Sequence, residues 1–321
     1  KVVADHLVRE SGIRPILHCY AVDVIFEEGS NCLKGIVTES KSGRQVVLAQ
    51  RIIDRTGDAD IAHLAGASYR KTPKDKMLGM TTVFNASGVD KDRFLEYTEA
   101  QPATYADWSR TWQQQTTGKE EALRSPYLDK EFDQARALGV IPQDSTNLGG
   151  SWSSLTEAGE ANNLNLVHMY GFDPTDVLDL TRAEMQGRTE ALQALMALKA
   201  VVPGFEKAKL RNFSMTMGVR DSRKIIGRTN LTGDDVRNQA TFADSIGIFP
   251  EFIDGYAVLI LPSTGRYFEV PYGCMVPLEV DNLLVAGRCV AGDMVSHAAM
   301  RNMMACTVTG QGAGVAAAVS V

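Results

Sequence analysis

The feature that most constrains the fold of this chain is a strand, a glycine turn and a helix near its C-terminal end. Residues 282–286 form a short apolar run, Gly287 and Arg288 follow it, and residues 297–319 have the small-residue pattern of a long helix. Backbone N–H groups and the helix dipole favour negative charge at such a turn. The segment therefore predicts an α/β fold with a turn that binds an anion or a cofactor, although close packing of a helix on a sheet explains its glycines equally well.

A second segment of the same kind lies near the other end of the chain. Residues 51–54 (RIID) predict a short buried strand, and Thr56, Gly57 and Asp58 follow it at the turn before a short helix over residues 59–65. Glycine at this place lets the backbone approach a planar or phosphorylated ligand without a clash at Cβ. A plain strand-to-helix turn is the better account of this segment when it is taken alone.

The rest of the chain predicts an antiparallel meander and a longer, more polar middle region. Alternating residues over 16–49, with turns near 28–31 and 41–43, favour the meander. The other elements expected from periodicity, caps and turn residues are helices over residues 1–11, 90–101, 125–138 and 181–201, the last opened by a capping box at Thr181, and a Gly/Ser loop over residues 147–154.

A third segment, residues 217–228, carries two arginines. Arg220 and Arg223 are three residues apart, so on a helix they would share one face and could clamp a carboxylate or contact the edge of a cofactor. A solvated basic face, balanced by nearby aspartates, is the alternative.

Three glycines interrupt the predicted C-terminal helix. Gly310, Gly312 and Gly314 each cost a helix about 1 kcal/mol relative to alanine, so we expect something to approach the helix closely there. For Gly312 and Gly314, close packing of the helix on a sheet is the better account.

Charge and cysteine usage exclude several classes of function. The chain has 33 Lys and Arg against 39 Asp and Glu, a net charge of −6, and no basic stripe, which argues against nucleic acid as a partner. It contains no run of about 18 uncharged apolar residues, so no membrane span is predicted. The five cysteines include no CxxC pair, which favours a reducing compartment, and we expect a cytoplasmic protein. No spacing of His, Cys and Asp is typical of a metal site.

Three segments in the same order resemble one family. Residues 52–67 (IIDRTGDADIAHLAGA), residues 218–236 (GVRDSRKIIGRTNLTGDDV) and residues 281–319, which open with DNLLVAGRC, resemble the FAD-dependent oxidoreductases of the glutathione-reductase-like superfamily. That superfamily is distantly related to fumarate reductase flavoproteins, and its pattern for the first segment is IDATGDGD. The resemblance implies FAD as the cofactor and an incomplete Rossmann-like FAD-binding domain with a mixed α+β substrate or cap insertion.

The resemblance also predicts a division of the chain. Residues 1–70 would be the first part of the FAD-binding domain, residues 271–321 its C-terminal part, and residues 71–270 the cap. Such enzymes begin with a GxGxxG turn that holds the FAD pyrophosphate, which this chain lacks, and it starts at Lys1. We therefore expect an N-terminally truncated chain that is inactive alone, and an exposed apolar sheet edge that favours homo-oligomers.

Individual roles follow from the resemblance. Val22 would give a backbone contact to the adenine, the two glycine turns would hold the pyrophosphate and ribityl chain, and Arg301 would lie at the pyrimidine end of the flavin. The predicted FAD contacts are Val22, Thr56, Gly57, Asp58, Gly287, Arg288, Gly292, Asp293 and Arg301, and the predicted catalytic residues are His297, Arg220 and Arg223. His297 would transfer a proton or bind substrate, with a structural role at a helix terminus as the alternative.

The implied function is hydride transfer between flavin N5 and a small organic substrate. His168 and the tryptophans Trp108, Trp112 and Trp152 are candidate substrate contacts. A cofactor-free binding or assembly subunit derived from such a flavoprotein is the alternative. A nicotinamide-dependent Rossmann enzyme has less support, because the phosphate-binding glycine fingerprint is missing.

Overall fold

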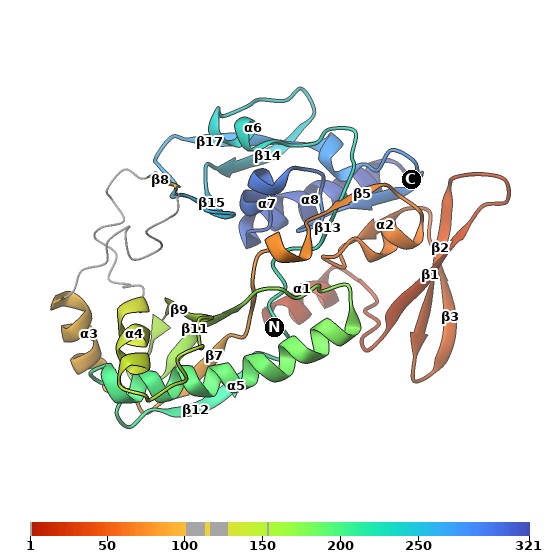
Figure 1. Cartoon of the computed structure of the whole chain (residues 1–321). Coiled ribbons are helices and arrows are strands. Elements are labelled where there is room, and N and C mark those ends of the chain that lie inside the picture. The colour runs from red at the N-terminus through yellow and green to blue at the C-terminus, as the bar shows by residue number, and fades with distance from the viewer. Residues whose placement is uncertain (1, 101–112, 116–127, 153) are drawn as a thin grey trace.

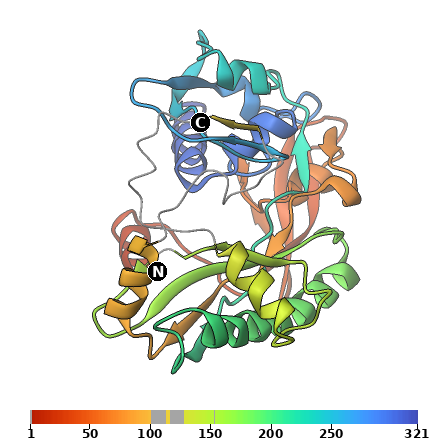
Figure 2. The same ribbon diagram turned by 60° about the vertical axis from the view of Figure 1, so that its left-hand side comes forward.

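The computed structural model describes residues 2–100, 113–115, 128–152 and 154–321. Its helices and strands are mixed and form two halves (Figure 1, Figure 2), as expected for an α/β fold. We call the half around the parallel strands β4 (Ile52–Asp54) and β18 (Leu283–Val285) the strand-pair half, and the half around a six-stranded sheet the large-sheet half. In Figure 1 the strand-pair half lies above the large-sheet half.

Strands β4 and β18 confirm the two predicted apolar strands. They run parallel, with Leu283 opposite Ile52 and Val285 opposite Asp54. All three residues of β18 are buried and apolar, and β4 has the buried Ile52 and Asp54 on either side of the partly buried Ile53. The other elements of this half are α2 (Asp60–Leu64), β5 (Tyr69–Lys71), η1 (Lys74–Lys76), β8 (Gln113–Gln115), β13 (Arg223–Ile225), α6 (Gly233–Arg237), β14 (Ser245–Pro250), β15 (Ile253–Gly255), β16 (Val258–Ile260), β17 (Tyr267–Pro271), η4 (Tyr272–Met275), α7 (Met294–Met300) and α8 (Met303–Val319).

The predicted meander and the predicted first helix are confirmed. Helix α1 (Val2–Glu10) buries no residue. It precedes three antiparallel strands in the order β1 (Tyr20–Phe26), β2 (Leu33–Ser40) and β3 (Gly43–Leu48). The strands project from the body at the right of Figure 1.

The large-sheet half is organised around one long strand, which pairs with four others. Its helices cover the sheet, and the helix α5 confirms the predicted end at residue 201. The elements are β6 (Met80–Thr81), β7 (Phe84–Ser87), α3 (Lys91–Ala100), α4 (Asp129–Ala137), β9 (Leu148–Ser151), β10 (Ser154–Leu155), the central strand β11 (Ala161–Met169), α5 (Val177–Val201) and β12 (Lys209–Phe213), which pairs with β7.

Helix α5 lies close against the sheet because its inner face is made of small residues. A Cβ on Gly187 would lie 2.1 Å from Thr82 Oγ1, so only glycine allows this approach. Ala183, Ala191 and Ala194 on the same face are fully buried. Among the helices of the described residues, none is both long and apolar enough to cross a membrane.

Two hydrophobic clusters form the cores, one in each half. The first draws on residues 33–67 and 225–313, and the second on residues 80–217. Core residues between 225 and 270 therefore pack with the strand-pair half. The predicted division at residues 70 and 270 stays a prediction.

Two predictions in the middle region are wrong in part. The expected loop over residues 147–154 contains β9 and the first residue of β10, and its glycines serve close contacts, since a Cβ on Gly149 would lie 2.0 Å from Asp129 Oδ1. The helix expected from Thr181 begins four residues earlier, because the Asp176 carboxylate accepts the N–H groups of Leu178 at 2.8 Å and Asp179 at 3.2 Å.

Two predicted helices have a different form. The long helix over residues 297–319 is divided into α7 and α8, because the Asn302 side chain donates to the carbonyls of Ala298 and Ala299 and ends α7. The helix on which Arg220 and Arg223 would share a face does not form, since β13 lies within residues 217–228 as a strand antiparallel to β5. The predicted helices over 90–101 and 125–138 correspond to α3 and α4 within the described residues, and Trp108 and Trp112 lie outside them.

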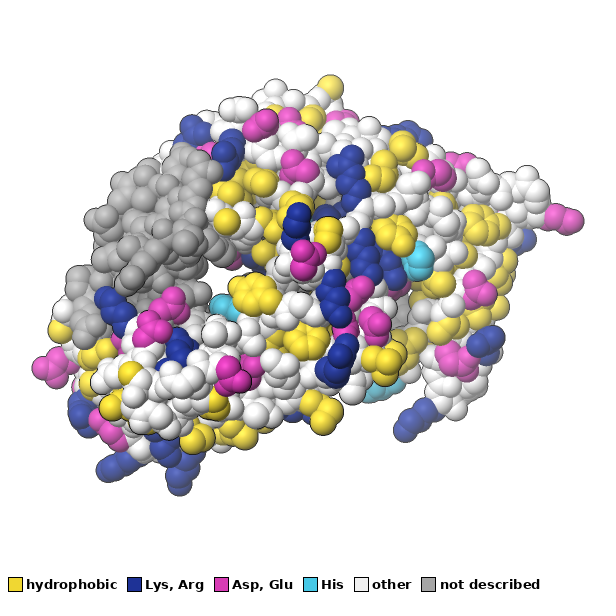
Figure 3. Space-filling view, viewed as in Figure 1, with side chains coloured by type: hydrophobic (Ala, Val, Ile, Leu, Met, Phe, Trp, Pro, Cys, Tyr) yellow, Lys and Arg dark blue, Asp and Glu magenta, His cyan; other side chains and the backbone are white. Residues whose placement is uncertain are grey.

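Ion pairs join the two halves along the seam. The ammonium of Lys71 lies 2.5 Å from Asp173 Oδ2, and that of Lys74 lies 2.5 Å from Asp179 Oδ2. Figure 3 shows charged side chains of both signs gathered along the middle of this face. Lys74 and neighbouring donors hold the pKa of Asp179 at about 2.

Candidate functional site

The carboxyl ends of β4 and β18 form one edge with an unusual backbone. Gly57, three residues after β4, has φ +86°, and Gly287, two residues after β18, also has φ +86°. This left-handed region is open to glycine without strain. We call residues 56–58 and 286–288 the glycine edge. Ligands of open α/β sheets bind outside the carboxyl ends of the strands, which is where this edge lies.

Arg288 joins the two sides of the glycine edge. Its Nε donates to Gly57 O at 2.8 Å, its Nη2 to Asp58 Oδ1 at 2.7 Å, and its Nη1 to Val219 O. A Cβ on Gly57 would lie 2.7 Å from Arg288 Nη2, so glycine is required for the guanidinium to lie there. Burial raises the pKa of Asp58, although Arg288 opposes that shift.

The buried Asp54 carboxylate fixes the turn that follows β4. Its Oδ1 accepts the N–H of Thr56 at 2.9 Å and the Thr56 hydroxyl at 2.8 Å, and its Oδ2 accepts the N–H of Ala62 at 2.9 Å. Ala59, with φ 53° and ψ 41°, then leads into α2 in a left-handed conformation. The turn is therefore set by hydrogen bonds before any ligand binds.

Arg55 is a residue of this edge that the sequence analysis missed. A Cβ on Gly310 of α8 would lie 2.8 Å from Arg55 Nη1, so the predicted close approach at Gly310 is confirmed and the approaching group is this guanidinium. Gly312 meets Ile246 instead, as predicted for packing, whereas a Cβ on Gly314 would have nothing within 4 Å. The position of Arg55, directly after the buried strand, could have indicated its role.

Gly292 and Asp293 join α6 to α7. The Asp293 carboxylate accepts the N–H of Ser296 at 2.7 Å and that of Gly233 at 2.9 Å. A Cβ on Gly292 would lie 2.5 Å from Ser296 Oγ. Their predicted contacts to the ribityl chain stay predictions, as does the adenine contact of the half-exposed Val22.

The structure separates the two predicted arginines. Arg223 donates to Asp60 Oδ1 at 2.8 Å and to Asp58 O at 3.1 Å, so its side chain supports the turn after β4. Arg220 instead lines a cavity on the other side of the segment. Because no helix forms here, the expected common face does not exist.

A buried polar network lies behind Arg220. The Lys224 ammonium donates to Asp221 Oδ1 at 2.5 Å and to Thr72 Oγ1 at 3.0 Å, and the Tyr256 hydroxyl donates to Asp221 Oδ2. The side chains of Lys224 and Asp221 are only 2% and 0% exposed. Burial alone would raise the pKa of Asp221, but Lys224 holds it below its ordinary value, whereas burial lowers the pKa of Lys224.

His297 belongs to the same network. Its Nε2 lies 3.0 Å from Arg220 O, and because a carbonyl can only accept, Nε2 carries the proton of the neutral ring. Burial and the Lys224 ammonium lower the pKa of His297 to about 3. The ring is therefore neutral at ordinary pH and holds the backbone of Arg220 in place.

A strained turn presents Tyr256 to this network. Tyr256 and Ala257, between β15 and β16, have φ 53° and 60°, where two-residue hairpin turns usually carry Asn and Gly. Such strain persists where the surrounding structure imposes it, and it gathers at functional sites. The Asp254-Gly255 pair favours a turn two residues earlier in the chain, so the sequence analysis missed Tyr256.

A cavity of about 250 Å³ lies between the two halves beside this network. Arg301 lies in its wall and donates to the carbonyl and the carboxylate of Asp254. Tyr170 lies in the wall from the large-sheet half, just after β11. The residues that line the cavity are Asp75, Lys76, Met77, Leu78, Gly79, Tyr170, Arg220, Asp254, Gly255, Tyr256, Ala257 and Arg301.

Two polar atoms near this cavity have no hydrogen-bond partner among the described residues. They are Arg301 Nε and His168 Nε2, and both are buried. Burial, then the charges of Arg220 and Arg301, lower the pKa of His168 to about 3. The field of both arginines therefore reaches β11, and the neutral His168 ring lies within it.

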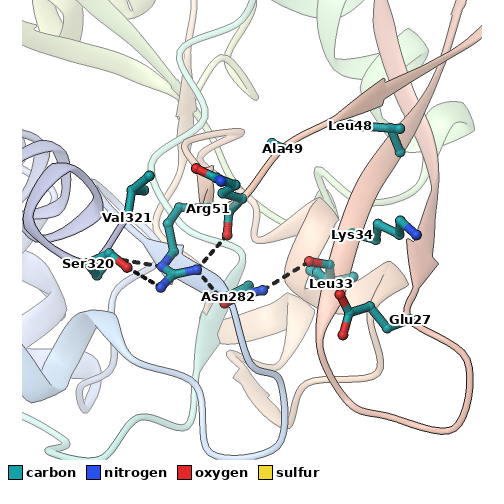
Figure 4. Close-up of a pocket in the computed structure, with 10 residues that line it drawn as sticks. Glu27, Leu33, Lys34, Leu48, Ala49, Arg51, Asn282, Ser320 and Val321 are labelled. Carbon is teal, nitrogen blue, oxygen red and sulfur yellow. Dashed lines mark hydrogen bonds between the residues drawn. The ribbon is translucent and has the colours of Figure 1, made fainter.

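A larger recess, of about 570 Å³, lies at the opposite edge of the strand pair (Figure 4). Arg51, just before β4, donates to Asn282 Oδ1 at 2.9 Å and to Ser320 Oγ at 2.8 Å. Its guanidinium is thus bound by the chain itself. This edge holds the amino ends of the strands, so we place the candidate site at the glycine edge and not in this recess.

The glycine edge fits FAD. Gly57 is partly buried and Gly287 is buried, and Arg55 and Arg288 bring two guanidinium groups beside these glycines, which matches a diphosphate. Burial raises the pKa of Cys306 in the first turn of α8, but Arg55, Arg288 and Arg301 oppose the shift, so the same region has a positive potential. All five cysteines are free, and no cluster of His, Cys, Asp and Glu within the described ranges is arranged to hold a metal ion.

Comparison with known proteins identifies the family. No curated protein sequence is matched by the chain. The model of a family described as FAD dependent oxidoreductase matches residues 1–321, the whole sequence given. The chain therefore belongs to the FAD dependent oxidoreductase family, and its cofactor is FAD.

Proposed function

We propose that the chain transfers a hydride between FAD, held at the glycine edge, and a small organic substrate in the cavity beside Arg301. The observation that carries this proposal is the edge itself. Two parallel strands end in positive-φ glycines, and two arginines lie beside them. Bound flavin supplies an atom, N5, that accepts or gives a hydride reversibly.

Arg55 and Arg288 have different tasks in this proposal. Arg288 is already bonded to Gly57 and Asp58, so it keeps the two sides of the edge at a fixed spacing. Arg55 lies over Gly310 and would neutralise phosphate charge. Thr56 and Asp58 hold the turn, and the lack of a side chain at Gly57 leaves room for the Arg288 guanidinium.

His297 acts in this proposal as a positioning residue. Its Nε2–H fixes the carbonyl of Arg220, whose side chain lines the cavity. Asp221 and Lys224 hold the ring from behind, and Tyr256 connects this buried network with the cavity. The second half of the molecule supplies Tyr170 and so acts as a cap that excludes water from the cavity.

Titration of the purified chain with FAD tests the cofactor site. We expect flavin fluorescence to be quenched and the visible absorbance to shift on binding. Arg55→Gln and Arg288→Gln should each weaken binding at least about tenfold, since each removes a charge-assisted contact or its support. Arg70→Gln, which removes the same charge from an exposed position of β5, is the matched control and should bind as the wild type does.

Hydride transfer is tested on the flavin-loaded chain. Anaerobic addition of small organic reductants should bleach the flavin absorbance, and a deuterium at the donor carbon should slow that step. Equal FAD affinity in both arginine variants would refute the glycine edge as the cofactor site. Wild-type protein that takes up no FAD would favour a cofactor-free binding subunit.

A further inference from the structure

The cavity beside Arg301 has a charge pattern that selects among substrates. Arg220, Arg301 and Lys76 bring positive charge to its wall, against the carboxylates of Asp75 and Asp254. Among the side chains that line the cavity, positive charges therefore exceed negative charges by one. This excess suits a single negative charge.

The bonding of Arg301 is incomplete within the described residues. One edge of its guanidinium donates to Asp254, at 3.0 Å for the contact to Oδ2. Its Nε is buried and has no acceptor there. A buried donor without a partner is unfavourable, so an acceptor from a ligand would remove that cost.

The large-sheet half contributes Tyr170 to the cavity wall. The Tyr170 ring lies close to Gly79, where an added Cβ would be 3.0 Å from Cε1, so the backbone positions this ring. A ligand in the cavity thus meets the two guanidinium groups and the Tyr170 ring.

We propose that the substrate of this site is a small monocarboxylate, whose carboxylate group is bound by Arg220 and Arg301. This inference rests on the proposed function and names its substrate class. A planar carboxylate matches the planar guanidinium fork. A phosphate monoester, which is close to doubly charged, would be repelled by Asp75 and Asp254, and the volume of about 250 Å³ is sufficient for a small carboxylate.

Ligand-observed NMR on the purified chain tests the proposal with three probes. They are butyrate, its uncharged isostere butyramide, and methyl phosphate. We expect butyrate to bind at least about tenfold more tightly than either of the others, since loss of a charged hydrogen bond costs about 1.5–3 kcal/mol. Arg220→Gln and Arg301→Gln should each weaken butyrate binding at least tenfold, and Arg70→Gln should leave it unchanged.

A second variant keeps the test sharp if Arg301→Gln does not fold. Arg301→Lys retains the charge but loses the fork, and we expect intermediate affinity for butyrate. FAD content is recorded separately for every protein, so failure of the cofactor site is distinguished from failure of the cavity. Equal binding of butyrate and butyramide, preference for methyl phosphate, unchanged binding in both arginine variants, or no butyrate binding by the wild type would each overturn the proposal.

Discussion

The glycine edge and the cavity beside Arg301 are built in opposite ways. The edge consists of consecutive residues after two strands, and its polar side chains Asp54, Thr56 and Arg288 are already bonded within the chain. The cavity takes residues from several distant segments, and two buried polar atoms beside it lack a partner among the described residues. The edge is thus a finished support for a cofactor that stays, whereas the cavity is completed by a ligand that comes and goes.

The largest expected effect concerns the buried ion pair of Asp221 and Lys224 beside the cavity. Asp221→Ala leaves the Lys224 ammonium buried without its partner, and breaking a buried ion pair in this way costs about 3–5 kcal/mol. Urea denaturation measures the loss. The double variant Asp221→Asn/Lys224→Met should recover most of it, and a loss below about 1 kcal/mol in the single variant would mean that the network does not support the cavity.

The pH dependence of the unfolding free energy tests whether His168, beside the cavity, is buried in its neutral form. His168 has a native pKa of about 3 and titrates near 6.5 when unfolded, so the unfolded state binds more protons between those values. Stability should therefore fall as the pH drops below about 6.5, by at most about 1.4 kcal/mol per pH unit for this residue. His168→Gln should flatten the curve of unfolding free energy against pH. His297 contributes the same trend, so part of the slope should persist, and an unaltered slope would contradict the buried neutral His168.

A pair of glycine variants tests whether the edge is a ligand support. Gly57→Ala and Gly66→Ala both place alanine at positive φ, +86° and +77°, at a cost of about 1–2 kcal/mol each. Only the Cβ at residue 57 meets Arg288. We expect both variants to lose thermal stability, Gly57→Ala more because its Cβ also meets Arg288, and at least a tenfold loss of FAD affinity for Gly57→Ala alone. Parallel losses of FAD affinity in both variants would show that the edge responds only to global stability.

The smallest expected effect concerns the backbone conformation of one alanine at the glycine edge and one at the cavity. Ala59 at the edge and Ala257 at the cavity both have positive φ, and the family pattern has glycine at the first of these positions. Ala59→Gly and Ala257→Gly should each stabilise the protein by up to about 1 kcal/mol, since the strain of alanine is removed. Ala200→Gly in α5, where the backbone is helical, is the control and should destabilise it. Guanidinium denaturation measures all three, and a loss at either positive-φ site would contradict the strain.

The glycine edge can be predicted from the sequence because the residues that form each of its turns are close together in the chain. A strand, a glycine and a helix within about ten residues are enough to indicate a backbone cradle, and both copies of that pattern lie where expected. The meander and the end of α5 follow from equally local patterns. Arg55 was within reach of the same reasoning, since it directly follows the buried strand.

The cavity could not be predicted in this way, because its members are close only in space. Arg220 and Arg223 are only three residues apart in sequence, yet Arg220 lines the cavity whereas Arg223 donates to Asp60. Tyr256 depends on a strained turn that no propensity favours. Tertiary contacts decided these positions, and they overrode the helical spacing of the two arginines.

The parallel pairing of β4 with β18 has a consequence for how the protein acquires its cofactor. The contact from Arg288 Nε to Gly57 O joins positions that are 231 residues apart. Pairing at such separation requires closure of a long loop, which slows folding more than it lowers stability. The glycine edge therefore cannot form during synthesis until residue 288 has left the ribosome, whereas the meander and α2 can form earlier. FAD can therefore bind only after β4 and β18 have paired. Because a ligand that binds the folded state stabilises it, supply of FAD should raise the yield of folded protein.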